Sequence, residues 1–216
     1  MKYELVVFDW DGTLLDSAGA IVRAIQAACR DLDLQVPDDY RARHVIGLGL
    51  VDAMRHAVPD LPAGRYQEMV DRYRHHYLSG DHQLTLFDGI PEMLARLKRD
   101  GHILAVATGK SRAGLERALD HSGLRSMFMA SRCADECHSK PHPQMLDELM
   151  AEFGMGNAAT LMIGDTSHDL LMASNAGVDG LAVTYGAHTH DYLLEHRPVA
   201  CLHNVGELDQ WLKDHA

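Results

Sequence analysis

Short apolar runs alternate with amphipathic stretches along most of the chain. The helical patterns between the later runs span 90–99, 113–121, 143–153 and 168–176. The apolar runs themselves occupy residues 3–8, 102–107, 127–130, 159–163 and 181–184. Runs with so little polar alternation are typical of strands buried on both faces. Strands that alternate with helices predict an α/β fold with a doubly wound parallel sheet covered by helices.

The alternation is interrupted between residues 16 and 86, where only helical patterns occur. One apolar helical face there is formed by Ile21, Val22, Ile25, Ala28, Cys29 and Leu32. A second such face is formed by Tyr66, Met69, Val70, Tyr73 and Tyr77. Faces of this period are typical of amphipathic helices. We therefore expect an all-helical cap domain at 16–86, inserted into an α/β core domain that comprises 1–15 and 87–216.

Charge is distributed unevenly between these two parts. The 216-residue chain has 20 Lys and Arg against 31 Asp and Glu, a net charge of −11. The inserted segment has eight Arg, ten acids and no Lys, so the core carries about −9 of that charge. An acidic chain without a Lys/Arg cluster predicts no nucleic-acid partner. We also expect no membrane span, no signal peptide and four reduced cysteines, and hence a cytoplasmic protein. We expect a monomer, because the inserted segment must move and the sequence has no obvious exposed apolar stripe.

Pairs of carboxylates follow two of the predicted strands. Asp9 and Asp11 come directly after the first run, where Gly12 permits a sharp turn. Asp165 and Asp169 come after the run that ends near residue 163. The first pair alone would equally suit an ordinary acidic turn, but ligands bind at the carboxyl ends of parallel strands. Several carboxylates in one crevice require a cation, and few oxygen ligands with room for water favour Mg²⁺.

Two further short motifs add groups that a phosphoryl ligand would need. Thr108 and Gly109 end another predicted strand, and Lys140 lies just before a predicted helix. A hydroxyl, an ammonium and free amides at a helix N-terminus are suitable donors to phosphoryl oxygens. Each motif is weak by itself, because Thr-Gly pairs and surface lysines are common.

The order of these motifs, D-x-D-G-T, then T, K and G-D-x-x-x-D, resembles the haloacid dehalogenase superfamily. The position of the insertion resembles the branch that includes phosphoglycolate phosphatases and β-phosphoglucomutases. The resemblance covers about residues 8–184 and implies a Rossmann-like sheet of strand order 3-2-1-4-5. That order would place Asp9 and Asp165 on adjacent strands.

The same resemblance implies roles for the first two aspartates. Asp9 would be the nucleophile that forms an aspartyl-phosphate, and Asp11 the acid and base that serves the leaving alcohol and then water. Mg²⁺ would be bound by the Asp9 carboxylate, the Asp11 backbone carbonyl and Asp165.

The remaining motif residues would serve the phosphoryl group. By the resemblance, Thr108, Gly109 and Lys140 would hold the phosphoryl oxygens. Asp169 would orient Lys140 or a metal-bound water. In the insertion, Arg43 and His44, together with Arg41, are candidates for substrate contact. A solvated helix face is the alternative interpretation of those cap residues.

Two activities remain open on this basis. The first is a Mg²⁺-dependent phosphatase for a small phosphorylated metabolite, for which 2-phosphoglycolate is a candidate. The second is a sugar phosphomutase of the β-phosphoglucomutase type. Asp11 argues against dehalogenation, because a halide leaves without a proton. The absence of Lys from 16–86 argues against phosphonoacetaldehyde hydrolysis, and the insertion argues against a signalling receiver domain.

Overall fold

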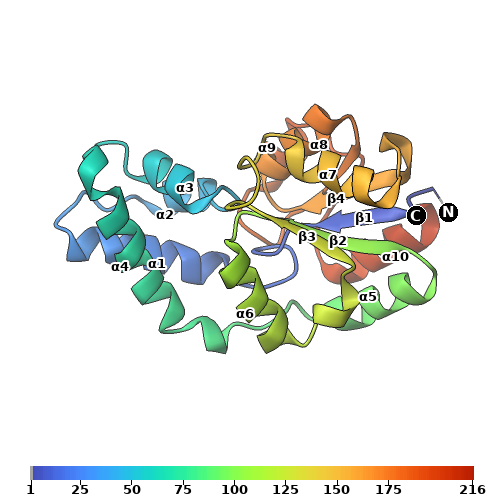
Figure 1. Cartoon of the computed structure of the whole chain (residues 1–216), viewed down its shortest axis with the longest axis horizontal. Helices are drawn as coiled ribbons and strands as arrows, with labels where there is room; N and C mark the ends of the chain where they lie inside the picture. Colours follow the sequence, from blue (N-terminus) through green and yellow to red (C-terminus); the bar gives the residue numbers. More distant parts are fainter. Residues whose placement is uncertain (1) are drawn as a thin grey trace.

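The computed structural model describes residues 2–216, which form a parallel sheet with helices on both faces and a helical segment at one end (Figure 1). The strand order is β3-β2-β1-β4-β5-β6, so the predicted order 3-2-1-4-5 is confirmed. A sixth strand extends the sheet; it has two residues, too few for a recognisable pattern. The strands are β1 (Leu5–Phe8), β2 (Ile103–Thr108), β3 (Ala130–Cys133), β4 (Thr160–Gly164), β5 (Asp179–Val183) and β6 (Cys201–Leu202).

The prediction for the third strand was wrong in its position. We expected it at 127–130, but Met127 ends the 3-10 helix η3 (Arg125–Met127) and β3 begins at Ala130. The strand lies at the edge of the sheet, and three of its four residues are only half-buried. Its sequence is therefore mostly small or polar, and the apolar run just before it is a misleading signal.

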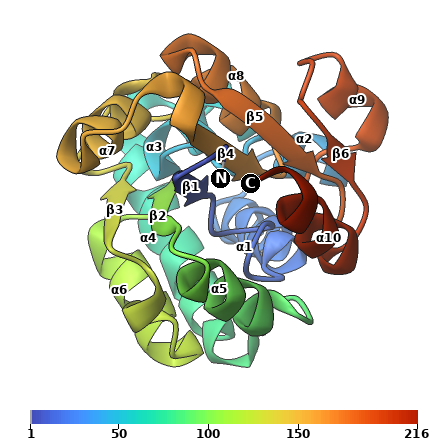
Figure 2. The ribbon, with the colours of Figure 1, turned by 90° about the vertical axis from the view of Figure 1, so that its right-hand side faces the viewer.

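Two apolar layers cover the two faces of the sheet. Val6 and Phe8 pack on the same side as α5 (Ile90–Arg99), α6 (Arg112–Ser122) and α10 (Val205–His215). Leu5 and Val7 pack on the opposite side, with α7 (Gln144–Phe153) and α8 (Ser167–Ala176). Figure 2 shows the sheet between these two groups of helices. Alternate side chains of a strand point to opposite faces, so β1 is buried on both.

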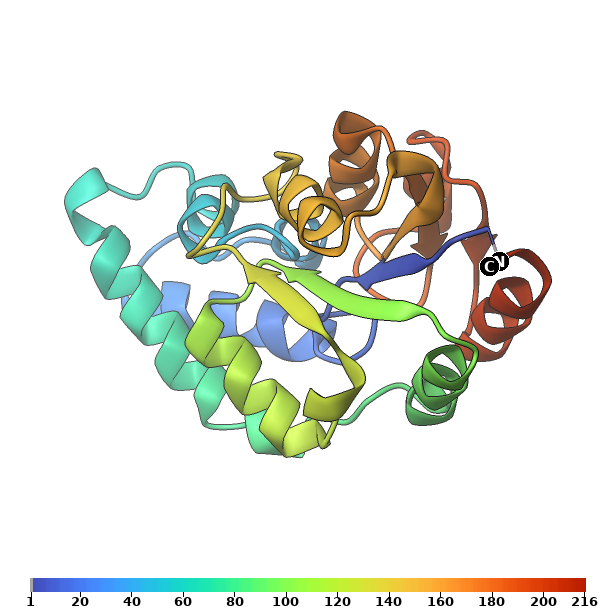
Figure 3. The ribbon, with the colours of Figure 1, turned by 45° about the vertical axis from the view of Figure 1, so that its right-hand side comes forward.

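The inserted segment has an apolar cluster of its own, to which the core contributes Ala187. Its chain leaves and re-enters the core at one place, where an isolated bridge joins Leu15 to Leu86. Two chain segments that lie side by side therefore connect the cap to the core. The domain boundaries at 15/16 and 86/87 remain a prediction. The segment comprises α1 (Ala18–Asp31), α2 (Asp39–His44), α3 (Leu50–Ala57), η1 (Ala63–Arg65), α4 (Tyr66–Leu78) and η2 (Asp81–Gln83) (Figure 3).

The two ends of the described chain lie close together, on the side of the sheet opposite the cap (Figure 1). The ring of Tyr3 stacks on Trp211 of α10 with 6.2 Å between the ring centroids. The short helix α9 (His190–Leu194) packs through Leu193 beside β5. Among the helices that the structure describes, none is long and apolar enough to cross a membrane.

Candidate active site

Three carboxylates meet at the carboxyl edge of the sheet. Asp9 follows β1 and Asp165 follows β4, two adjacent strands on which Phe8 pairs with Ile163. Asp169 lies in the first turn of α8. One oxygen of each carboxylate lies within 4.8 Å of the others, and all three side chains are buried. The structure therefore brings together the three aspartates that the sequence places far apart.

One ammonium group lies inside this cluster. Lys140 Nζ is 2.8 Å from Asp9 Oδ1 and donates a hydrogen bond of 2.6 Å to Asp169 Oδ1. Its side chain is fully buried. Burial alone would lower the pKa of Lys140, but the carboxylates of Asp169 and Asp9 raise it above its usual value. Lys140 therefore stays charged and neutralises part of the acidic cluster.

The three carboxylates differ in how their oxygens are satisfied. Thr13 Oγ1 donates to Asp165 Oδ1 at 2.9 Å, and the backbone amide of Ala187 donates to Oδ2 at 2.7 Å. Asp169 Oδ2 accepts from both the amide and the hydroxyl of Thr166, in the capping box of α8. Oδ1 of Asp9 is paired with the ammonium of Lys140, and within the described residues its Oδ2 has no hydrogen-bond partner. Asp9 is thus the buried carboxylate with free lone pairs.

Glycines allow the backbone to approach the acidic cluster closely. A Cβ atom at Gly12, whose φ is +81°, would lie 2.1 Å from Asp165 Oδ2. A Cβ at Gly186 would lie at the same distance from that oxygen. Both distances are far shorter than any van der Waals contact, so side chains at these positions would displace Asp165.

The acidic cluster fits a divalent cation. Burial raises the pKa of Asp9 well above its usual value despite Lys140, and Asp169 and Asp165 raise it further. Burial and the charge of Asp169 likewise raise the pKa of Asp165. These raised pKa values result from several negative charges in a small buried volume, and a cation that the carboxylate oxygens bind would offset that repulsion. Asp9 is the best-suited ligand, because its Oδ2 has no partner within the described residues. Asp165 suits a cation better than Asp169 does, because Asp165 accepts from the neutral donors of Thr13 and Ala187, whereas Asp169 is paired with the ammonium of Lys140.

The carboxylate of Asp11 does not join that cluster. Ser17 Oγ donates to Asp11 Oδ1 at 2.7 Å, and Lys110 Nζ lies 3.0 Å from Oδ2. Lys110 also donates to the hydroxyl of Tyr77 on α4, at 3.1 Å. Sequence reasoning missed Lys110, although its place two residues after Thr108 is a signal that could have found it. The Asp11 backbone carbonyl remains the predicted metal ligand from this residue.

The Thr108-Gly109 pair lies where the core meets the cap. Thr108 ends β2, and its buried hydroxyl accepts a hydrogen bond from the amide of Lys110 at 3.2 Å. A Cβ atom at Gly109 would lie 2.5 Å from the carbonyl oxygens of both Gly47 and Leu48 in the cap. Glycine at 109 is therefore what allows the loop between α2 and α3 to rest on the end of β2.

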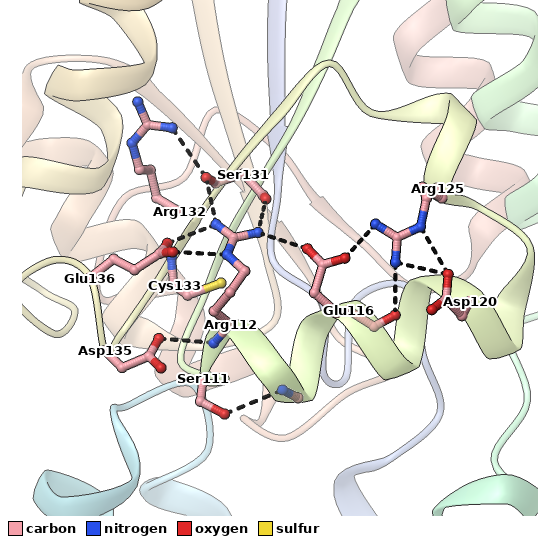
Figure 4. A network of polar contacts seen from close by, with 11 residues as sticks. Ser111, Arg112, Glu116, Asp120, Arg125, Ser131, Arg132, Cys133, Asp135 and Glu136 are labelled. Carbon is pink, nitrogen blue, oxygen red and sulfur yellow. Dashed lines mark hydrogen bonds and ion pairs between the residues drawn. The ribbon is translucent and has the colours of Figure 1, made fainter.

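The loop that carries Lys140 is anchored to α6 by a network of charged side chains (Figure 4). Arg112, at the start of α6, pairs with Glu136 of that loop at 2.7 Å, and its amide donates to Asp135 at 2.8 Å. Arg112 also pairs with Glu116, which in turn pairs with Arg125. At the other end of the loop, Ser139 Oγ accepts from the amide of Gly49 in the cap.

A cavity of about 670 Å³ opens beside Asp9 and Asp11, and the cap candidates lie away from it. Arg43 donates from Nη1 to the carbonyl of Gly186 at 3.4 Å, and Arg41 lies on a separate hollow of the cap. The ring of His44 stacks on His188 with 4.9 Å between centroids. Neither Arg43 nor His44 is among the residues that line the cavity.

His44 instead takes part in the contact between cap and core. Its carbonyl oxygen lies 2.8 Å from His168 Nε2 and 3.3 Å from His188 Nε2. Burial beside His168 and His44 lowers the pKa of His188 to about 3, so that imidazole is neutral at pH 7. Because His188 Nδ1 accepts from the amide of Ser167, its Nε2 carries the proton that is donated to His44.

Residues 6–183 match a family described as "Haloacid dehalogenase-like hydrolase". The chain is 40% identical to "Probable phosphatase IndB" of Dickeya dadantii, over 94% of this chain and 91% of that protein. It is 33% identical to a "5'-nucleotidase" of Pseudomonas aeruginosa, over 100% of this chain and 98% of that protein. Among solved structures, a predicted phosphatase from Clostridium acetobutylicum is similar, with a TM-score of 0.87 and 25% identity. That similarity covers 99% of this chain and 100% of the other.

Proposed function

The chain belongs to the haloacid dehalogenase-like hydrolase family and is a phosphatase of that family, and we propose that it hydrolyses a phosphomonoester through an aspartyl-phosphate on Asp9. The observation that supports this proposal is the environment of the Asp9 carboxylate. Its carboxylate is buried, Oδ1 is paired with Lys140, and Oδ2 has no hydrogen-bond partner within the described residues. A carboxylate with free lone pairs at the edge of the sheet is suited to attack.

In the proposed first step, an Asp9 oxygen forms a bond to phosphorus while the bond from phosphorus to the substrate alcohol breaks. Asp11 gives its proton to the departing oxygen, so the alcohol leaves neutral. Asp11 must therefore carry a proton and turn away from Ser17 and Lys110 toward that oxygen. In the second step water attacks the phosphorus, Asp11 takes its proton, and phosphate leaves Asp9.

The proposed roles of the neighbouring residues follow from charge. Lys140, Thr108 and Gly109 hold the phosphoryl oxygens, and Asp169 keeps the ammonium of Lys140 in place. Mg²⁺, bound by Asp9 and Asp165, would reduce the repulsion between the nucleophile and the phosphoryl group. A bound cation would also offset the crowding of carboxylates that raises the pKa of Asp9.

The identity of the substrate is a further part of this proposal. The resemblance favours a small metabolite such as 2-phosphoglycolate, with a sugar phosphomutase of the β-phosphoglucomutase type as the alternative. The printed name of the Pseudomonas relative indicates nucleotides for that protein, so nucleotides belong among the compounds to be tested. Residues 16–86 would act as a cap domain over the reaction, in a protein that we expect to be cytoplasmic and monomeric.

The test is phosphate release from a panel of phosphomonoesters with added Mg²⁺ or with excess EDTA. The panel contains 2-phosphoglycolate, sugar phosphates and nucleotides. We expect turnover with Mg²⁺ and loss of turnover with EDTA. Phosphate release that persists in EDTA would contradict the proposed requirement for Mg²⁺. Isomerisation of a sugar phosphate that needs a bisphosphate activator would favour the mutase.

A further inference from the structure

The cavity beside the two catalytic aspartates is large for a small leaving group. It holds about 670 Å³ and lies between the cap and the segment that follows β2. Cavities of roughly 300–1,000 Å³ are the size that encloses drug-sized ligands. The alcohol released from 2-phosphoglycolate has only a few heavy atoms and would leave most of this volume empty. Size alone therefore favours a bulkier alcohol.

The cap side of the cavity is mainly apolar. The residues that line it are Ile21 and Ile25 of α1, Ile46 of the loop between α2 and α3, and Met54 of α3, and all four are buried. An apolar face of a ligand is stabilised when it leaves water for contact with such a wall. An unpaired charge placed against such a wall loses its hydration without compensation. The wall therefore favours a ligand with an apolar face.

Two tyrosines continue this wall on α4. Tyr73 and Tyr77 both line the cavity, and their rings stack with 5.7 Å between centroids. Burial raises the pKa of both phenols above the usual value, so both remain neutral at any working pH. Neutral aromatic side chains at a cavity wall offer packing to a planar ring rather than attraction to an anion.

The cations that line the cavity already face acids. Lys110 pairs with Asp11 and donates to Tyr77. Arg74 and Arg117 have side chains that are 52% and 54% exposed, and each lies 3.9 Å from an acid outside the cavity. A carboxylate on the leaving alcohol would have to compete with Asp11 for Lys110. Lys110, the lining cation beside Asp11, is thus already paired, whereas Arg74 and Arg117 lie at the exposed part of the lining.

We propose that the substrate is the phosphomonoester of a nucleoside-sized alcohol whose ring, with a largely apolar face, lies in this cavity. This inference rests on the proposed function, because it places the reacting phosphoryl group at Asp9. The ring would pack against the apolar wall of α1, α3 and α4, which is where substrate preference is set. The same apolar wall would disfavour a small alcohol that carries a negative charge.

The test compares kcat/KM for pairs of compounds that differ only in the ring. Uridine and adenosine 5'-monophosphates are each compared with ribose 5-phosphate, and thymidine 5'-monophosphate with 2-deoxyribose 5-phosphate. We expect at least one nucleotide to exceed its matched sugar phosphate, and also 2-phosphoglycolate, by about tenfold or more. The inference is overturned if every nucleotide is equalled by its sugar phosphate or by 2-phosphoglycolate. Release from none of these compounds would instead contradict the proposed function.

Variants of the cavity wall provide a second readout. Leu50, half-buried in α3, lines the cavity, whereas Leu194 of α9 is 47% exposed and does not. Leu50→Lys should lower the ratio of nucleotide to sugar-phosphate kcat/KM by about tenfold, and the uncharged Leu50→Thr should lower it less. Leu194→Lys should leave the ratio unchanged. A ratio that Leu50→Lys does not change, in a protein that melts normally, would overturn the inference.

Discussion

The core and the cap contribute opposite surfaces to one cavity. The core edge presents buried charge, with Asp9, Asp165 and Asp169 around the single ammonium of Lys140. The cap presents mostly aliphatic and aromatic side chains and carries only about −2 of the net charge. Buried charges require partners at fixed distances, whereas apolar contacts are non-directional. On the proposed function, chemistry and substrate preference would therefore be set by different parts of the chain.

This difference predicts how the two parts respond to substitution. Changes at the charged edge should affect every substrate equally, because each substrate shares the same phosphoryl group. Changes in the apolar wall should alter the preference among substrates, because only the alcohol contacts it. Substitutions can therefore test the comparison in order of decreasing effect.

Replacing the proposed nucleophile should have the largest effect. Asp9→Asn keeps the size of the side chain but removes the attacking oxygen anion, so kcat should fall by at least about 10⁴-fold for all substrates. Steady-state phosphate release measures this, and circular dichroism checks the fold. Asp16→Asn, which changes an exposed acid just outside the site, should retain activity. Substantial turnover by folded Asp9→Asn would rule out the covalent mechanism.

Removing the buried ammonium should affect stability as well as activity. Lys140→Met leaves Asp9 and Asp169 without their shared cation, and breaking a buried ion pair costs about 3–5 kcal/mol. Urea unfolding in EDTA measures the loss. Added Mg²⁺ should recover part of it, because a ligand that binds only the folded state stabilises that state.

The matched control for this variant is an exposed lysine. Lys213 pairs with Asp209 on α10, and its side chain is 44% exposed. Exposed pairs contribute about 0–1 kcal/mol, so Lys213→Met should change the free energy of unfolding very little. Equal losses for the two variants would mean that Lys140 does not neutralise the acidic cluster.

The contact between the two parts should be sensitive to one methyl group. In Gly109→Ala the Cβ would meet the carbonyls of Gly47 and Leu48 at 2.5 Å, so the cap must move away from the core. A displacement of about 1 Å in a catalytic arrangement costs roughly 10²-fold in rate. We expect a loss of that order in kcat/KM. Gly156→Ala, where a Cβ meets nothing within 4 Å, should behave as wild type.

The charged edge was more predictable from the sequence than the cap. A predicted strand precedes Asp9 and another precedes Asp165, and a predicted helix follows Lys140. The strand order then brings the ends of the strands together. Parallel strands collect their carboxyl ends at one edge whatever the intervening sequence. The fold of the core was predictable for the same reason, apart from β3 and β6, whose short edge strands lack an apolar pattern.

The cap could be predicted as helices but not as a binding surface. The sequence made Arg43 and His44 candidates because they lie just before Gly47-Leu48-Gly49, and in the structure Arg43 contacts Gly186 and His44 stacks on His188. Their contact with substrate stays a prediction. The residues that line the cavity, such as Ile21 and Met54, look like ordinary core positions in the sequence. Which apolar face meets the substrate depends on how the helices pack against the core. That packing is set by non-local contacts such as the one at Gly109.

The smallest expected effect tests the charge difference between the two parts. The core carries about −9 and the cap is nearly neutral, so the field of the protein should repel an anionic substrate during its approach. Salt shortens the screening length to about 10 Å at 0.1 M, which weakens this repulsion but hardly affects the buried contacts at Lys140. Raising NaCl at constant Mg²⁺ should therefore increase kcat/KM modestly, by about twofold. A steep fall with salt would instead mean that a cationic patch at the cavity mouth, where Arg74 and Arg117 are half exposed, dominates the approach of the substrate.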